Sequence, residues 1–318
     1  MERYSPQARR LLCLAGASWS FAQSSSRLEE FCGIRVSDNT IRKISQDEGA
    51  AMQRWLRESP EPHETFKEAE GQVEFTTDGT SVNTHDGWRE MRVGIFSKRE
   101  PGESADASNW ADRQLPRPHV RLAFAAIEKS DRFVSRWGHW SRRLGVKRTN
   151  ELSVLADGAP WIWEGASLHF AGHDGVLDIY HALEHVAEAV RGLFGEGTDE
   201  AAQWLETSRE ALLSGGWPGM WQVLCDMKRI VSRSRWTKHG KPLSNYLSRR
   251  REELNYPSRL KRGLPIGSGQ VEGACKHMIG RRLKQTGARW RIRRVNRMAG
   301  LVSQFYSKQW DTYWQAQT

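Results

Sequence analysis

Cysteine is scarce in this sequence of 318 residues, and its few occurrences are scattered. This spacing argues against a zinc ribbon and against a disulfide scaffold, and it is consistent with a reducing cytoplasm. The four cysteines, which form no C-x-x-C pair, are Cys13, Cys32, Cys225 and Cys275.

Long apolar runs are also missing. No run approaches the length of a membrane span, and the N-terminal segment MERYSPQARR lacks the apolar core of a signal peptide. The sequence has neither the glycine pattern of a P-loop nor a Ser-His-Asp order typical of covalent hydrolases. We therefore expect a cytoplasmic, nucleoid-associated protein with no membrane partner.

Positive charge, in contrast, is abundant and concentrated. The net charge is +10, but residues 226–300 alone hold 21 lysines and arginines against four acids, a net +17. The rest of the chain therefore carries about −7. Such a concentration is either a solvated basic face or the footprint of a polyanionic partner, and its density favours double-stranded DNA.

Residues 1–70 are expected to form a helical, helix-turn-helix-like unit that ends in an acidic, proline-containing linker. A short helix at Ser25–Phe31 is followed by a glycine-containing turn and a second helix, Asn39–Gln46, with Ser or Asp at its cap. This order predicts DNA contacts by the exposed Arg42 and Lys43. Many helical hairpins have the same pattern, so a purely structural role stays open.

The next region, residues 71–197, is expected to be an α/β unit. Alternating or continuous apolar residues predict four strands, with an amphipathic helix at Asp131–Leu144 between the third and the fourth. The order β-β-β-α-β is that of the first half of a ribonuclease-H-like domain. The predicted strands are Gln72–Asp78, Trp88–Ser97, His119–Ile127 and Leu152–Asp157.

The remainder is expected to be helical. Leu177–Leu193 has an apolar stripe at helical spacing, and residues 198–258 are interpreted as an all-helical insertion within the α/β domain. Residues 259–318 then complete the catalytic domain with a helix that contains Glu272 and one final helix over Arg291–Thr318.

Three carboxylates stand where this fold would gather them. Asp78 ends the first strand and Asp157 the fourth, and these two strands are neighbours in a ribonuclease-H-like sheet. Glu272 follows a Gly-Ser-Gly break at the start of a helix and would complete an oxygen-ligand set for Mg²⁺ or Mn²⁺. Two such metals would support phosphodiester cleavage and transesterification without a covalent nucleophile.

Each acid also has a structural interpretation. An aspartate before glycine at a strand end, such as Asp78 or Asp157, is often a turn residue. Glu272 could instead interact with the dipole of its helix. The metal site rests on the three acids occurring together.

A fourth acid, Asp178, lies three residues before His181 on one predicted helical face. His181 could hydrogen-bond a phosphate oxygen near the metals, and Asp178 could support it. The alternative is that Asp178 caps the helix while His181 packs against neighbours.

Basic residues follow Glu272 closely and are expected to neutralise DNA phosphates from a strongly basic helix. These residues are Lys276, Arg281, Arg282, Lys284 and Arg289.

Several of these segments resemble one known family. The sequence is similar to ISKra-type bacterial insertion-sequence transposases and, more loosely, to the wider Mutator-like group of DDE transposases with an Asp-x-x-His motif. The likeness covers about residues 5–310. It rests on TTDGTSV (Thr76–Val82), VLADGAPWIW (Val154–Trp163), DIYHALEH (Asp178–His185) and LPIGSGQVEGACKHMIGRRLKQTGARW (Leu264–Trp290).

The resemblance implies a DDE triad of Asp78, Asp157 and Glu272, with Asp178 and His181 as the Asp-x-x-His pair. It also implies Mg²⁺-dependent cleavage at the element's terminal inverted repeats and strand transfer into target DNA by a homo-oligomer. Family members commonly carry more chain before the equivalent of Met1, so a truncated copy is an alternative expectation. Such a copy would be a non-autonomous DNA-binding remnant or repressor, and a Mg²⁺-dependent nuclease without strand transfer is the other alternative.

Overall fold

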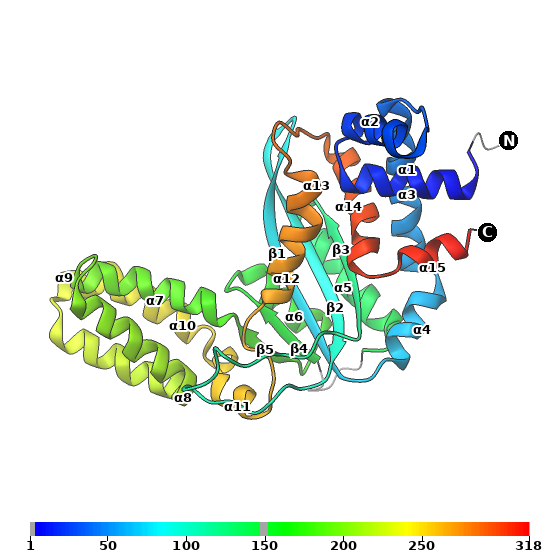
Figure 1. The fold of residues 1–318 in the computed structure, drawn as a ribbon. Coiled ribbons are helices and arrows are strands. Elements are labelled where there is room, and N and C mark those ends of the chain that lie inside the picture. Colours follow the sequence, from blue (N-terminus) through cyan, green and yellow to red (C-terminus); the bar gives the residue numbers. More distant parts are fainter. Residues whose placement is uncertain (1–3, 147–151, 318) are drawn as a thin grey trace.

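The computed structural model describes residues 4–146 and 152–317, and its centre is a five-stranded mixed sheet in the order β3-β2-β1-β4-β5 (Figure 1). The first three strands are antiparallel, and β4 and β5 run parallel to β1. The four predicted strands are confirmed, and β5 is an addition. The strands are β1 (Gln72–Thr84), β2 (Gly87–Arg99), β3 (Val120–Ala126), β4 (Leu152–Ala156) and β5 (Asp174–Leu177).

The β1–β2 hairpin is longer than predicted, because its strands stay paired from Gln72↔Arg99 out to Thr84↔Gly87. Gly87 has φ +87°, a conformation that side-chain-bearing residues rarely adopt, and this allows the chain to reverse there. The turn between these two strands is therefore confined to the tip of the hairpin. Asp78 consequently lies inside β1 and not at its end.

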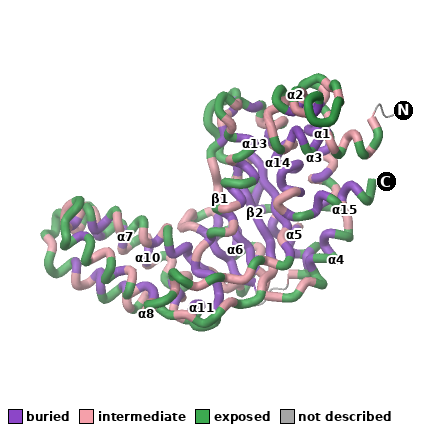
Figure 2. Tube along the Cα trace, in the orientation of Figure 1, coloured by how far each residue is buried: buried purple, intermediate pink, exposed green. Residues whose placement is uncertain are grey.

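Alternation along the strands gives the sheet two buried faces, which appear purple in Figure 2. One face presents Val93, Ile95 and Ala123 to helices from the C-terminal part of the chain. The opposite face presents Phe75 and Phe96 to α5 (Ser130–Arg143) and α6 (Pro160–His169). Because helices cover both faces, β3 and β4 are buried along almost their whole length.

Four helices precede the sheet, and serine side chains cap the first three. The third is much longer than the predicted Asn39–Gln46 segment. The expected proline-containing linker is itself largely a helix, because Pro60 stands in a first turn, where its missing N–H costs nothing. The helices are α1 (Pro6–Ser18), α2 (Phe21–Cys32), α3 (Asp38–Glu58) and α4 (Pro60–Glu68).

A helical lobe follows β5 and projects away from the sheet (Figure 1). Its apolar core joins α7 to α8 and α10, so the lobe includes residues before the predicted start at 198. The backbone N–H of Ile179 donates to the carbonyl of Ile266 at 3.0 Å, so the chain leaves and re-enters the sheet region at one place. The lobe elements are α7 (Ile179–Phe194), α8 (Asp199–Ile230), α9 (Arg233–Arg235), the π-turn η1 (Trp236–Gly240), α10 (Lys241–Ser248), the 3₁₀ turn η2 (Arg251–Glu253) and α11 (Tyr256–Lys261).

The predicted basic helix after the Gly-Ser-Gly break is shorter and less regular than expected. It consists of α12 (Gly269–Ala274), a π-helical segment η3 (Cys275–Gly280) and α13 (Arg281–Leu283), so Lys284 and Arg289 lie beyond its end. The C-terminal segment is two helices and not one, α14 (Ile292–Tyr306) and α15 (Trp310–Gln315). Lys308, with φ +55°, breaks them apart.

In the two described ranges, no helix combines the length and the apolar character that crossing a membrane requires.

Candidate functional site: an aspartate pair at the sheet edge

Asp78 in β1 and Asp157, the residue directly after β4, occupy equivalent positions along two adjacent parallel strands. The β1–β4 pairing runs from Val73↔Leu152 to Thr76↔Leu155, a constant spacing of 79 residues that also separates the two aspartates. Side chains alternate along a strand, so Asp78 shares the face of its partner Val93, which α12 and α14 cover. The structure therefore brings these two predicted residues together.

The electrostatics of Asp78 agree with this placement. Burial raises the pKa of Asp78, and the nearby Asp157 carboxylate raises it further, while the hydrogen bond from the Gly79 amide opposes both. His181 also lies near enough to act on Asp78, and it lowers the pKa of that carboxyl. A carboxylate whose charge is disfavoured by burial and by a second carboxylate is one that a cation would stabilise.

Each aspartate also makes a local backbone contact, as its structural interpretation requires. Asp78 Oδ1 accepts from the Gly79 amide at 2.6 Å, and Asp157 Oδ1 accepts from the Ala159 amide at 2.9 Å. These bonds fix the orientation of both carboxylates. They engage one oxygen of each, and the other oxygen makes no hydrogen bond to any described residue.

Glu272 does not join the pair in this structure. Its side chain is 60 % exposed and forms an ion pair with Lys276 at 2.5 Å, one turn further along. Over the described ranges, no group of three His, Cys, Asp or Glu residues is arranged to hold a metal ion. The expected three-acid cluster is therefore absent from the described residues, and the glutamate pairs instead with a lysine of its own helix.

The helix that carries Glu272 nevertheless covers the aspartate face. Cys275, buried in η3, has its pKa raised to about 12 by burial, and Asp78 and Glu272 both contribute to that shift. The thiol thus lies within electrostatic range of both acids. Glu272 is on the correct side of the sheet, with its carboxylate engaged elsewhere.

Asp178 caps α7 and also links it to Ser268; this second link is called the clasp below. One carboxylate oxygen accepts from the Tyr180 and His181 amides at the start of α7, as the structural interpretation predicted. The other oxygen accepts from the backbone amide and the hydroxyl of Ser268, both at 2.5 Å. Asp178 is 3 % exposed, so it positions α12 and does not face a substrate.

The helical lobe contributes a residue that the sequence did not suggest. Tyr246, on α10, lies against Gly158, next to Asp157, and the pKa of its phenol is raised to about 12 by burial and by the Asp157 carboxylate. The ring of His185 packs on Tyr246, with the centroids 4.0 Å apart. No spacing rule links Tyr246 to Asp157, because the lobe separates them in sequence.

The basic residues predicted to contact DNA have different environments. Arg282 is 3 % exposed, and its Nε donates to the Gly16 carbonyl at 2.6 Å, so it is not the open surface contact that was expected, and only its Nη2 is left without a partner among the described residues. Lys284 donates to the Thr80 hydroxyl, two residues after Asp78. Arg289 donates to carbonyls at the tip of the β1–β2 hairpin, and Arg281 is exposed.

Arg42 and Lys43 line a basic groove that could not be recognised from the sequence. The groove, about 810 Å³ in volume, lies between the start of α3 and the start of α14. Arg42 lowers the pKa of Arg294 by charge repulsion, which shows that the two guanidinium groups are close. The arginines that α14 and the residue before it add to this groove are Arg291, Arg293, Arg294 and Arg297.

Comparisons with known proteins add little at this point. No family model matches the chain, and no curated protein does. A solved structure entitled "Drosophila P element transposase strand transfer complex" aligns with a TM-score of 0.42 and 10 % identity, covering 95 % of this chain and 92 % of that one. A similarity at this level carries no functional argument, so the proposal below depends on the geometry of the chain.

Proposed function

We propose that the chain is a DNA transposase that cleaves DNA at the ends of an insertion sequence and joins those ends to target DNA. The observation that carries this proposal is the lateral pairing of Asp78 and Asp157 on the sheet face that α12 covers. The strand order supports a ribonuclease-H-like catalytic core, in which the first and fourth strands are neighbours. The resemblance of four sequence segments to ISKra-type transposases gives the same assignment.

The aspartate pair fits a hard divalent cation such as Mg²⁺ or Mn²⁺. Mg²⁺ in proteins is commonly held by one or two carboxylates together with water and phosphate oxygens. Asp78 and Asp157 would hold the cation, each through the carboxylate oxygen that accepts no hydrogen bond from a backbone amide. A bound cation would stabilise the charge that develops on phosphoryl oxygens during cleavage.

The remaining residues have supporting roles in this proposal. Lys284, held at Thr80, would approach a phosphate close to Asp78. His181, half-exposed and near Asp78, would donate a hydrogen bond to a phosphate oxygen. Glu272 would join the two aspartates once DNA phosphates attract Lys276 away from it, because an exposed ion pair is weak and easily exchanged.

Basic surfaces would supply most of the affinity for double-stranded DNA. The groove that Arg42, Lys43 and Arg294 line brings several cationic side chains together at the surface. We propose that it binds phosphates of the element ends, since arginine pairs well with phosphate.

The test is cleavage of labelled element-end DNA in Mg²⁺. Asp78→Asn and Asp157→Asn should each abolish cleavage, while the exposed hairpin variant Asp86→Asn should leave it intact. Glu272→Gln should also abolish cleavage, and unchanged cleavage would remove Glu272 from the site. Products joined to target DNA separate a transposase from a Mg²⁺-dependent nuclease, which would only nick or cut.

A second candidate is a DNA-binding remnant or repressor without catalysis. The Glu272–Lys276 ion pair favours it, because it leaves the aspartates without a third acid. This alternative predicts tight duplex binding with no cleavage at any Mg²⁺ or Mn²⁺ concentration.

A further inference from the structure

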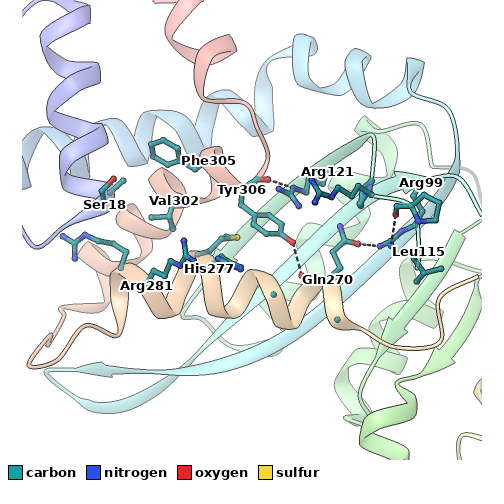
Figure 3. A pocket seen from close by; sticks show the side chains of 18 residues that line it. Ser18, Arg99, Leu115, Arg121, Gln270, His277, Arg281, Val302, Phe305 and Tyr306 are labelled. Carbon is teal, nitrogen blue, oxygen red and sulfur yellow. Dashed lines mark hydrogen bonds between the residues drawn. The ribbon is translucent and has the colours of Figure 1, made fainter. Parts of the chain in front are cut away.

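A separate cavity of about 770 Å³ lies between α12–α13, α14 and the segment that precedes β3 (Figure 3). Gly269 and Gly273 line it from one face of α12, and His277 continues that side. Glu272 and Lys276 pair on another face of the same helix. The cavity is therefore distinct from the aspartate pair, although one helix borders both.

Positive charge dominates this arginine cavity, and no aspartate or glutamate is among the described residues that line it. Two of its arginines are already engaged, because Arg99 pairs with Glu74 and Arg121 donates to the Tyr306 carbonyl. The other arginines that line the cavity are Arg117, Arg281 and Arg282.

The other arginines of the cavity carry positive charge that no acidic side chain among the described residues neutralises. Within the described ranges, neither Arg117 nor Arg281 forms an ion pair, and both are exposed. A wall with several unneutralised arginines favours an anionic ligand.

Buried donors without partners point to the same ligand. Arg282 is only 3 % exposed, and its guanidinium packs over the rings of Phe21 and Trp290. Its Nε donates to Gly16, but Nη2 has no hydrogen-bond partner among the described residues. Gln270 Nε2, which also belongs to this wall, is equally unpaired.

Unpaired buried donors cost free energy, so a ligand with acceptor oxygens would be stabilised here. Phosphate oxygens meet this need, because guanidinium groups bind them through paired hydrogen bonds. The cavity also has an apolar side formed by Leu115, Val302 and Phe305, against which a nucleobase could pack.

We infer that the arginine cavity binds the phosphates of a single DNA strand. Its volume lies within the range of about 300–1,000 Å³ typical of small-ligand sites, which suits one or two nucleotides and not a duplex. The inference rests on the proposed function in one respect, that DNA cleavage provides an unpaired strand. Its position beside α12 would let a strand released near the aspartates pass along the helix.

The test uses a charge change at a position with free space. A Cβ built on Gly273 meets no atom within 4 Å, so Gly273→Gln and Gly273→Glu are variants of equal size that differ in charge. Binding of a short fluorescein-labelled oligothymidylate is measured by anisotropy in EDTA. We expect Gly273→Gln to bind close to the unaltered protein and Gly273→Glu to bind about tenfold more weakly, through repulsion of phosphate.

Arg281→Gln provides a second measurement that removes one charge from the cavity and leaves α12 unchanged. It should reduce the slope of log affinity against log salt by about 0.7, the value for one phosphate contact on a single strand. Equal affinity of the two Gly273 variants, together with an unchanged slope in Arg281→Gln, would overturn the inference.

Competition separates a strand from a free nucleotide. Thymidine monophosphate and pyrophosphate should displace the oligonucleotide only at far higher concentration. If the variants lose mononucleotide binding and keep strand binding, the cavity is a nucleotide site and the inference is wrong. Because no metal is present, Asp78→Asn should bind the strand normally, so failure of the cleavage proposal remains distinguishable.

Discussion

Asp178 and Ser268 lie 90 residues apart in sequence and are joined by two hydrogen bonds of 2.5 Å to one carboxylate oxygen. The same carboxylate caps α7 through its other oxygen. One buried side chain thus fixes both the start of the helical lobe and the turn that leads into the Glu272 helix.

This arrangement predicts a large effect of Asp178→Asn on stability. An amide offers one acceptor oxygen, so either the cap or the clasp loses its partner. We expect the free energy of unfolding in urea to fall by about 1–3 kcal/mol, and Ser268→Ala to cost about 0.5–1.5 kcal/mol. The control Asp112→Asn, on an exposed loop, should leave the free energy of unfolding unchanged. If Asp178→Asn is as stable as the unaltered protein, the hydrogen bonds of Asp178 do not stabilise the fold.

Gly158 predicts a steric effect next to Asp157. A Cβ there would approach the Tyr246 ring and hydroxyl to 2.3–2.6 Å, far closer than van der Waals contact. Gly158→Ala should therefore displace Tyr246 and lower the melting temperature, with a cost of about 1–3 kcal/mol typical of overpacking.

Tyr246→Leu should restore part of that loss in the double variant. Gly215→Ala is the matched control, because its Cβ would meet nothing within 4 Å. A Gly158→Ala protein as stable as the control would show that the Tyr246 contact yields without cost.

The Glu272–Lys276 pair predicts a gain of metal affinity. Removal of the lysine charge in Lys276→Gln frees the glutamate, so Mn²⁺ should bind more tightly in calorimetry if Glu272 can reach the aspartates. The gain should not exceed about fivefold, since an exposed pair contributes at most about 1 kcal/mol. The double variant Lys276→Gln/Glu272→Gln should lose the gain; a gain that persists would assign it to general charge.

The basic groove predicts a salt-dependent loss of duplex binding. Arg294→Gln should weaken duplex affinity and reduce the slope of log affinity against log salt by about 0.9, as expected for one phosphate contact on B-DNA. Arg209→Gln is the control, because that arginine pairs with Glu206 in the helical lobe, away from the groove. Identical slopes for both variants would exclude the groove as the duplex site.

His63 predicts a pH dependence of stability. Its ring is 2 % exposed, and burial lowers its pKa below the ordinary value, with a hydrogen bond to the Leu56 carbonyl in partial opposition. Below about pH 6.5 the unfolded chain binds a proton that the folded chain does not, so the free energy of unfolding should fall as the pH falls through this window.

His63→Gln should flatten that part of the urea-denaturation profile between pH 7 and pH 5, relative to the exposed-site control His119→Gln. Parallel profiles for the two variants would show that His63 does not contribute.

The sheet was largely predictable from the sequence, because apolar alternation and strand length are local signals. β5 escaped prediction, since four residues from Asp174 to Leu177 are too few to show a period and their hydrogen bonds come from the parallel neighbour β4. The helix at Pro60 was obscured by its prolines, which suit a first turn as well as a linker.

The site was predictable only where it depends on strand register. Asp78 and Asp157 come together because β1 and β4 pair in parallel with a constant offset of 79 residues, whereas Glu272 has a charged partner one turn away. The burial of Arg282 depends on the nearby Trp290 and on Phe21, which comes from the other end of the chain, and charge alone cannot reveal that. The Arg42–Arg294 groove likewise forms only when α3 meets α14.

The contact between Ile179 and Ile266 has a consequence for the order in which the protein forms during synthesis. All five strands lie between residues 72 and 177, so both aspartates are synthesised before the lobe, whereas α12 and α14, which cover their face of the sheet, come after it. The Glu272 helix arrives only after the lobe has brought the chain back to Ile179. A nascent chain that has reached the end of β5 therefore already contains both aspartates but not Glu272, which delays completion of the site until most of the protein has been made.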